Sequence, residues 1–302
     1  MQWMKRGRIF VPNRDFEWMV SHATMPTAER IAGHVYRIYF SSRDGYNRSN
    51  GAFLEIDIRN PHEILALSDR PVLAPGELGA FDDSGVLPSW LVKQGETTYL
   101  YYVGYHLGVT VPFSNFIGLA TAEVQGAPFR KVSRAPILDR NEFDPFLTIT
   151  PCVLIEDGLW RMWYSSGTHW SLEGGNPKHH YCIKYAESRD GFGWKRTGIT
   201  CIEYSSPAEY AVCRPCVLRD QNIYKMWFCY RGESYQIGYA ESIDGIEWER
   251  KDAQTGIDVS EAGWDSQMVA YPFVFDHEGI RYLLYNGNDY GRSGFGLAEM
   301  GS

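Results

Sequence analysis

The chain has 302 residues, is 44% hydrophobic and 15% aromatic, and carries a formal net charge of −8. That is enough apolar material for one large core, and closed all-β folds often reach this length as a single domain. The acidic balance argues against a duplex nucleic-acid partner, which requires a clustered basic face.

The N-terminal sequence and the cysteines indicate the compartment. The first ten residues, MQWMKRGRIF, lack the apolar run and small-residue cleavage site of a signal peptide. No apolar run is long enough to span a bilayer, so we expect no membrane partner. The six cysteines are scattered through one half of the chain, unlike the spacing of a small disulfide framework. We therefore expect a cytoplasmic protein.

The strongest pattern along the chain is an internal repeat marked by proline. Each repeat has a proline early in an apolar segment, then a polar turn, then an aromatic segment. The prolines are Pro26, Pro88, Pro151, Pro215 and Pro272, at intervals of 62, 63, 64 and 57 residues. The aromatic segments predict second strands at residues 35–40, 98–102, 161–164, 225–228 and 281–285. Third strands are predicted in four repeats, at residues 118–122, 184–188, 238–242 and 296–299.

This repeat predicts the fold class. Short apolar or aromatic runs separated by turn residues indicate consecutive antiparallel strands. Five units of about four strands, none able to bury both faces alone, predict an all-β, five-bladed β-propeller in a single domain. The blades are expected at approximately 20–75, 80–138, 142–203, 207–259 and 264–300. Because the last unit supplies only about three strands, we expect residues 8–12 to pair as its outer strand and close the ring.

Two similar turns, Ser188 to Trp194 and Ser242 to Trp248, indicate which face is structural. Their Asp and Gly suit a tight turn, and their Trp suits packing between blades. We therefore interpret Asp190 and Asp244 as structural residues and expect the functional site on the opposite face.

That opposite face collects acids from several blades. An acid shortly precedes the marker proline in four of the five repeats, and innermost strands begin near the central funnel of a propeller. We expect these residues to converge on one concave site, as ligand sites require. The acids considered for the site are Asp83, Asp144, Glu209 and Asp265. A single acid at such a position is more often a strand-start residue than a catalyst. The prediction of a site therefore depends on the occurrence of an acid in four repeats.

These features resemble the five-bladed β-propeller glycoside hydrolase superfamily, which includes arabinanases, xylosidases, invertases and β-mannoside phosphorylases. The five-unit pattern, the aromatic second strands and the segment Phe81-Asp82-Asp83-Ser84-Gly85-Val86-Leu87-Pro88 carry the resemblance. It implies an Asp on the first blade, an Asp on the second and a Glu on a later blade, acting as base or nucleophile, positioning group and general acid. The first blade departs from this pattern, because residues 20–26 offer His22 and no acid.

The chemistry of glycosidic cleavage gives an independent reason to look for two carboxyl groups. One must protonate the leaving oxygen while the other activates water or attacks the sugar. Burial or a neighbouring negative charge must keep the acid protonated near neutral pH. We predict Asp83 as the base and Glu209 as the acid, with Asp144 as the reserve.

Other side chains on this face are candidates for binding a substrate that is anionic or phosphate-dependent. Arg214 and Arg231 could hold a carboxylate or phosphate, or they could instead pair with the rim acids; the residues leave both interpretations open. Trp170 could stack on a sugar face. The full set of binding candidates is His22, Arg43, His169, Trp170, His180, Arg214, Arg231, Asp265 and Asn288.

Metal and cofactor motifs are weak, and we predict no cofactor. Cys213 and Cys216 are three apart on a predicted strand, so they point to opposite faces and are interpreted as buried thiols. His179 and His180 also diverge on a strand, although a loop could bring them to His169 around a cation, so that possibility stays open. No phosphate-binding Gly-rich loop or Gly-x-Ser-x-Gly elbow is present.

Three function classes remain. The first is a glycoside hydrolase acting on an oligosaccharide or glycoconjugate. The second is a glycosyl-transferring enzyme, a phosphorylase or transferase, which the missing first-blade acid and the basic rim favour. The third is a carbohydrate-binding propeller without catalysis, since a fold does not guarantee chemistry. The sequence predicts neither the sugar nor the oligomeric state.

Overall fold

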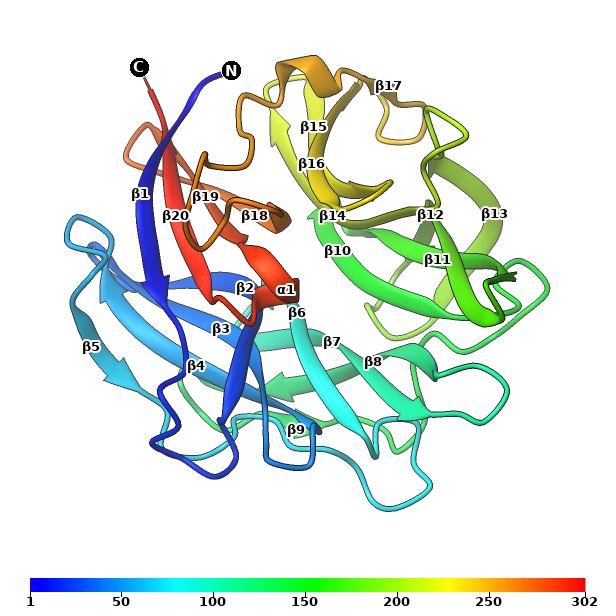
Figure 1. The fold of residues 1–302 in the computed structure, drawn as a ribbon, viewed down its shortest axis with the longest axis horizontal. Helices are drawn as coiled ribbons and strands as arrows, with labels where there is room; N and C mark the ends of the chain where they lie inside the picture. The colour runs from blue at the N-terminus through cyan, green and yellow to red at the C-terminus, as the bar shows by residue number, and fades with distance from the viewer. Residues whose placement is uncertain (302) are drawn as a thin grey trace.

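A computed structural model describes residues 1–301 and confirms the all-β fold class (Figure 1). The strands form sets of four that follow one another along the chain. The first two sets are β2 (Ser21–Ala32), β3 (Val35–Arg43), β4 (Ser49–Asp57) and β5 (Ile64–Leu67), then β6 (Gly85–Gln94), β7 (Thr97–Leu107), β8 (Phe113–Ala122) and β9 (Arg130–Lys131). The next two are β10 (Thr148–Glu156), β11 (Leu159–Glu173), β12 (Asn176–Ser188) and β13 (Trp194–Ile202), then β14 (Ala211–Asp220), β15 (Ile223–Arg231), β16 (Tyr235–Ser242) and β17 (Glu249–Arg250).

The last set combines the two ends of the chain. It contains β18 (Ala270–His277), β19 (Ile280–Asn286) and β20 (Phe295–Met300), and its fourth strand is β1 (Trp3–Phe10). β1 pairs antiparallel with β20 over most of its length, so the N-terminal strand lies slightly earlier than the expected residues 8–12. The helical elements within residues 1–301 are short, η1 (Asp252–Gln254) and α1 (Asn288–Gly291).

The sets surround a common centre with the first strand of each set innermost (Figure 1). Single parallel bridges join neighbouring sets at the start of the inner strands, Ser49 to Gly85 and Tyr181 to Ala211. The inner strands therefore begin at one shared end of the molecule. None of the helices within residues 1–301 is long and apolar enough to cross a membrane.

The marker prolines lie directly after a bulge in the inner strands. The preceding residue has a positive φ in four sets, at Met25, Thr150, Arg214 and Tyr271, and the strand pairing shifts register at each of these positions. Proline disfavours the right-handed helical conformation in the residue before it, and a bulge bends a strand. The repeated X-Pro pair therefore bends each of these inner strands at the centre of the molecule.

The bulges also connect neighbouring sets, because a left-handed residue directs its N–H out of its own ladder. The Met25 N–H donates to Asn286 Oδ1 at 2.8 Å and the Arg214 N–H donates to Thr150 Oγ1 at 3.1 Å. The Tyr271 N–H meets Cys229 Sγ at 2.9 Å. Each contact satisfies a buried donor, which offsets part of the cost of the strained backbone.

The two Asp-Gly turns are structural, as expected. Asp190 Oδ1 accepts from the N–H groups of Phe192 and Gly193 at 2.8 and 2.9 Å, and Asp244 repeats this arrangement in the next set. Backbone hydrogen bonds lower the pKa of both carboxyls. The buried Trp163 indole donates to Gly245 O at 2.7 Å, which joins the third and fourth sets.

Candidate functional site

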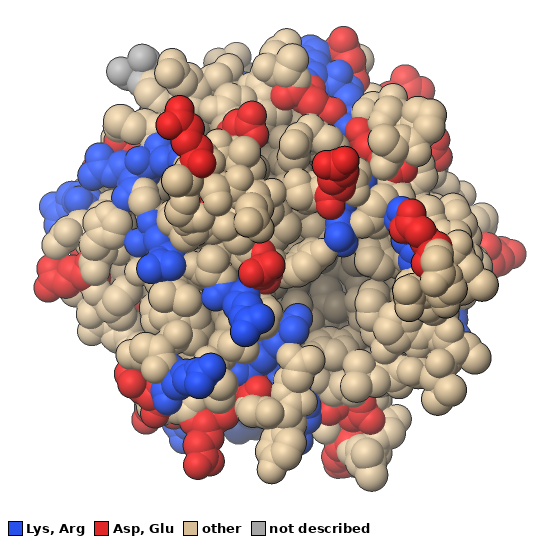
Figure 2. Space-filling view, viewed as in Figure 1, with Lys and Arg blue, Asp and Glu red and all other residues tan. Residues whose placement is uncertain are grey.

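The site face is the end of the molecule at which the inner strands begin and the second strands end. Register places Ser21 beside Arg43 and Ala211 beside Arg231 at this end, while the turns containing Asp190 and Asp244 lie at the other. In Figure 2 this face has a hollow near its centre, bordered on one side by Lys and Arg. The hollow is the funnel in which the acids were expected to converge.

Most of the acids expected in the funnel instead contact other strands of their own set. In four sets the acid ahead of the inner strand is bonded to a basic side chain on the outermost strand. These pairs are Asp82 with Lys131, Asp144 with Arg196, Glu209 with Arg250 and Asp265 with Lys5, at 2.6 to 3.0 Å. We call this repeated contact the acid–base lock.

A tyrosine from the second strand completes the lock in three of the four sets. Tyr102, Tyr164 and Tyr285 donate to Asp82, Asp144 and Asp265 at 3.1, 2.9 and 3.0 Å. The fourth set has Phe228 at this position, so Glu209 has no tyrosine partner among residues 1–301. Residues 20–26 of the first set contain no acid that could form a lock. The repeated acids are thus explained by strand packing, which also accounts for the missing acid of the first set.

This geometry corrects the roles predicted for Asp144 and Asp265. Asp144 is fully buried, and its oxygens accept from Tyr164, Ser166 at 2.6 Å and Arg196 at 3.0 Å, which leaves no free face for a substrate. Asp265 is 2% exposed and bonded to Lys5 and Tyr285. Neither acid lines the funnel.

The electrostatics of Glu209 also oppose its predicted role as the general acid. Burial disfavours the charged form, but hydrogen bonds from Arg250 and Ser205 outweigh it and hold the pKa of Glu209 below its usual value. The carboxylate accepts from Arg250 Nη1 at 2.8 Å and from the Ser205 N–H at 3.0 Å. An acid catalyst needs a raised pKa, so Glu209 is a poor proton donor in this environment.

Asp83 has a different environment from the other acids. Its oxygens accept from the Gly79 N–H at 2.9 Å and from Ser84 Oγ at 2.8 Å, and its side chain lines a cavity of about 610 Å³. His106 and Arg140 line the same cavity. Because Asp83 has no basic partner among the described residues and lines a cavity, its carboxylate is accessible to a ligand.

Arg214 occupies the centre of the molecule and not its rim. It is fully buried, donates to Ser89 O at 2.5 Å and to Thr27 Oγ1 at 2.9 Å, and has no carboxylate partner among residues 1–301. These bonds connect the fourth set with the first and second across the centre. Arg214 therefore fills the floor under the funnel, and neither of the roles predicted for it, substrate clamp or rim salt bridge, is realised.

Arg231 is the last residue of β15, at the site end of the strand, and lies inside a cage of aromatic rings. Its guanidinium carbon is 5.3 Å from the ring centres of Tyr210 and Tyr235 and 5.4 Å from that of Tyr290. Its buried Nε has no hydrogen-bond partner among the described residues. Stacking on tyrosine faces fixes the plane of an arginine without using its N–H donors.

His179 lies beside this cage and was not in the predicted set. Its ring stacks on Tyr181 at 4.4 Å and approaches Tyr210 at 6.0 Å, and its buried Nε2 lacks a partner in the described part of the chain. Burial, together with the charge of Arg231, lowers the pKa of His179 to about 4. It is therefore neutral at physiological pH and can donate or accept one hydrogen bond. Tyr210 and Tyr290 lie between strands, and His179 and Tyr235 lie near the starts of β12 and β16, two third strands of different length. The repeat pattern therefore could not identify them.

A second basic group lies on the first set. His22 Nδ1 is 3.0 Å from Ser21 Oγ, and burial together with Arg43 and Arg292 lowers the pKa of His22 to about 4. Arg43 bonds to Asn47 Oδ1 at 3.0 Å. His22 and Arg43 thus lie close together at the site end of β2 and β3.

The remaining binding candidates differ in their surroundings. His169 is exposed and stacks on His180 at 3.9 Å, and Trp170 packs on Phe113 at 5.4 Å. Asn288 accepts from the N–H groups of Gln267 and Met268 at 2.8 and 3.1 Å. These hydrogen bonds fix the loop that precedes β18, so the side-chain oxygen of Asn288 has a structural role and does not bind a ligand.

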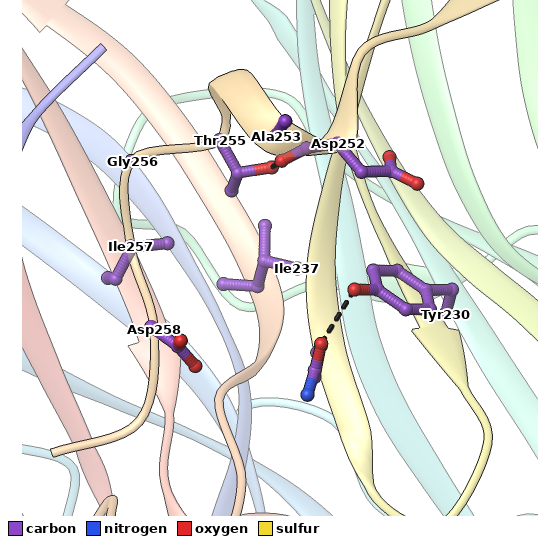
Figure 3. Close-up of a pocket in the computed structure, with 9 residues that line it drawn as sticks. Tyr230, Ile237, Asp252, Ala253, Thr255, Gly256, Ile257 and Asp258 are labelled. Atoms are coloured by element: carbon purple, nitrogen blue, oxygen red, sulfur yellow. Dashed lines mark hydrogen bonds between the residues drawn. The ribbon is translucent and has the colours of Figure 1, made fainter. Parts of the chain in front are cut away.

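Another cavity, of about 340 Å³, lies beside β15 and β16 under the segment that follows η1 (Figure 3). Tyr230 donates to Gln236 across its wall at 2.6 Å. Asp252 is bonded to Arg250 at 2.6 Å and so is not free for a ligand. Because Tyr230 and Asp252 are already bonded to other side chains, this cavity is a weaker candidate for a catalytic site than the funnel.

Comparison with solved structures defines the class of fold. A glycoside hydrolase matches 99% of this chain and 91% of its own at a TM-score of 0.77 and 16% identity. A thermostable family-43 glycoside hydrolase matches 96% and 92% at 0.70 and 16%. The β-1,2-mannobiose phosphorylase of Listeria innocua matches 99% and 96% at 0.74 and 11%. The resemblance to this propeller superfamily is confirmed at the level of the fold.

Sequence comparison places the chain more narrowly. It belongs to the family of two uncharacterized Mycobacterium tuberculosis proteins, MT1551 of strain CDC 1551 / Oshkosh and Rv1502 of strain ATCC 25618 / H37Rv. The identities are 47% and 46% over 300 residues, which is 99% of each chain. No family model matches the chain.

Proposed function

We propose that this protein is a carbohydrate-active enzyme that cleaves a glycosidic bond in its central funnel and passes the sugar to inorganic phosphate. The observation that carries the proposal is the division of charge on the site face. The acids of the repeats are bonded to the outer strands, whereas Arg231 faces the funnel without a carboxylate partner among the described residues.

Transfer to phosphate requires fewer carboxyl groups than transfer to water. Hydrolysis needs one carboxyl to protonate the leaving oxygen and a second to activate water or attack the sugar. Phosphate is already an anionic nucleophile, so one carboxyl is enough. A phosphate oxygen forms the new bond to the anomeric carbon while the glycosidic C–O bond breaks. Asp83 gives its proton to the leaving oxygen and regains one from the attacking hydrogen phosphate, which gives a sugar phosphate and a shortened saccharide.

Aromatic contacts connect the two halves of this proposed site. Asp83 shares its cavity with Leu107, which pairs with Phe113 at the end of β7 and β8. Phe113 lies 5.9 Å from His179, and His179 lies 6.0 Å from Tyr210 of the arginine cage. Aromatic faces suit the apolar faces of sugar rings, so this wall could hold the sugar between Asp83 and Arg231.

The experiment is a screen of the purified full chain against oligosaccharides with and without inorganic phosphate. We expect turnover that depends on phosphate and yields a sugar phosphate. Arg231→Lys should raise the KM for phosphate about tenfold or more, because lysine lacks the planar fork that the cage orients. Arg219→Lys is the matched control, because Arg219 also stacks on a tyrosine, Tyr224 at 5.3 Å, but lies at the opposite end of the molecule. Equal turnover without phosphate would overturn the transfer step, and the absence of turnover in both conditions would favour a binding function.

Hydrolysis is the second candidate, and one observation favours it. Asp139 lines the same cavity as Asp83, so two carboxyl groups lie on one surface. In that case both Asp83→Asn and Asp139→Asn should abolish turnover, whereas phosphorolysis requires only Asp83. The screen with these two variants therefore separates the candidates.

The remaining expectations about the whole protein stand as proposals. We propose a single domain of five blades, at the boundaries predicted from the sequence, since the strand sets follow that order. We also propose a cytoplasmic location. All six cysteines are free and buried within the described residues, which suits a reducing compartment. Limited proteolysis that releases a stable fragment would contradict the single domain, and fractionation of cells would test the location.

A further inference from the structure

A group of metal-ligand side chains lies at the opposite end of the molecule from the funnel. His34 is in the turn between β2 and β3, His277 is the last residue of β18, and Glu278 follows in the turn to β19. His34 Nδ1 and His277 Nε2 are 2.9 Å apart. Glu278 oxygens lie 3.8 Å from His34 Nδ1 and 3.9 Å from His277 Nε2. We propose that these three residues bind one Zn²⁺ ion and that the ion fastens the first strand set to the last.

The geometry suits a tetrahedral site. Ligand atoms about 2.0–2.2 Å from zinc lie roughly 3.3–3.5 Å apart in a tetrahedron. The three atoms here all lie within 4.8 Å of one another, so small side-chain rotations would place them around one ion. Two imidazoles and a carboxylate leave a fourth position for water.

The surroundings of His277 favour a ligand role over simple packing. Its other nitrogen, Nδ1, lies 3.1 Å from the Tyr36 hydroxyl. If Nδ1 carries the proton, it donates to that oxygen and leaves the lone pair of Nε2 directed at His34. A hydrogen bond on the second ring nitrogen is the usual way in which a metal-binding histidine is oriented. His277 is 5% exposed, whereas the Glu278 side chain is 61% exposed, so an ion can enter from the solvent side.

Comparison with the other strand sets strengthens the inference. The residue five positions after the marker proline is Glu156 in the third set, Asp220 in the fourth and His277 in the fifth. Glu156 bonds to Arg219 of the next set at 2.9 Å, and Asp220 lies 3.5 Å from Arg281 of the next set. Those two junctions each pair a carboxylate with a cationic side chain. The junction between the last and first sets instead has two imidazoles, which can both be neutral. A bound cation would supply the charge that the other junctions already contain.

The position of the site indicates what the ion does. His34 and His277 are 243 residues apart in the sequence. A cross-link that closes so long a segment removes more conformational freedom from the unfolded chain than a short one does. Because the site lies at the other end of the strands from Arg231 and Asp83, the ion stabilises the fold and takes no part in the funnel chemistry.

The test uses the full chain, stripped of metal with a chelator and titrated with ZnCl₂. We expect one equivalent to bind and the Tm to rise by roughly 5 °C at a free zinc concentration of 100 Kd. His34→Gln and Glu278→Gln should weaken binding about tenfold or more and remove most of the rise in Tm. Both residues are in surface turns, so these variants should fold even if His277→Gln does not.

The exposed stacked pair of His169 and His180 provides the matched control. His169→Gln should leave stoichiometry and affinity unchanged. Co²⁺ is a second probe, and the expected tetrahedral absorption bands should lack the thiolate charge transfer that a cysteine ligand would add. Failure of the wild type to bind zinc, unchanged binding in His34→Gln, or loss of binding in His169→Gln would each overturn the proposal.

Discussion

Replacement of Asp144 by Asn tests whether the repeated acids are structural or catalytic. Asp144→Asn keeps the shape of the side chain but removes its charge. Arg196 and Lys184, whose side chains are only 12% and 11% exposed, then lose their shared carboxylate. Removing one partner of a buried ion pair costs about 3–5 kcal/mol, because the remaining charge stays buried without compensation.

That free energy can be converted to a melting temperature. At about 2.1 cal/mol/K per residue, the entropy of unfolding of this chain is about 0.6 kcal/mol/K. The Tm of Asp144→Asn should therefore fall by about 5–8 °C. Turnover per folded molecule should stay within about twofold of the wild type at low temperature, because Asp144 has no face on the funnel.

The assay is thermal unfolding followed by circular dichroism, together with turnover on the substrate that the screen identifies. Asp83→Asn is the control for the Tm, because Asn can keep the hydrogen bonds that Asp83 makes with Gly79 and Ser84. Substitutions that break no buried contact usually change the free energy of unfolding by less than about 0.5 kcal/mol. A variant Asp144→Asn with an unchanged Tm and lost turnover would refute the acid–base lock and restore Asp144 to the mechanism.

Three further predictions concern the funnel and the lock. Asp83→Asn should reduce turnover about 10²–10⁴-fold without lowering the Tm; full activity would remove Asp83 from the mechanism. Tyr285→Phe should destabilise the protein by about 1 kcal/mol, since one hydrogen bond to a buried carboxylate is lost, and an unchanged Tm would mean that this bond contributes nothing. Folding lowers the pKa of His179 from 6.5 to about 4. Between pH 4 and pH 6.5, therefore, His179 is protonated in the unfolded chain and neutral in the folded chain. Stability should therefore fall as the pH drops from 6.5 to 4, and His179→Gln should reduce that fall in urea titrations; an unchanged pH dependence would contradict the neutral histidine.

The sequence by itself determined the repeat and therefore the fold. Alternation of apolar and turn residues predicts strands, and the marker proline at Pro26 and its equivalents sets their spacing. These are local properties, since each depends on a few neighbouring residues. The proline also indicated a special backbone position, which the structure shows to be the bulge at Met25 and at three equivalent residues.

Only the tertiary structure decided which side chains face the funnel. Asp83 and Asp144 look alike in the sequence, because both are acids shortly before an inner strand. Asp144 meets Arg196 from the outermost strand of its own set, 52 positions later, whereas the hydrogen bonds of Asp83 within residues 1–301 come from its near neighbours Gly79 and Ser84. The contact of a carboxylate with a distant strand depends on how the sheet folds back on itself. A short motif contains no record of that partner, so the sequence predicted that acids gather at this end of the molecule but not which of them are bonded to an outer strand.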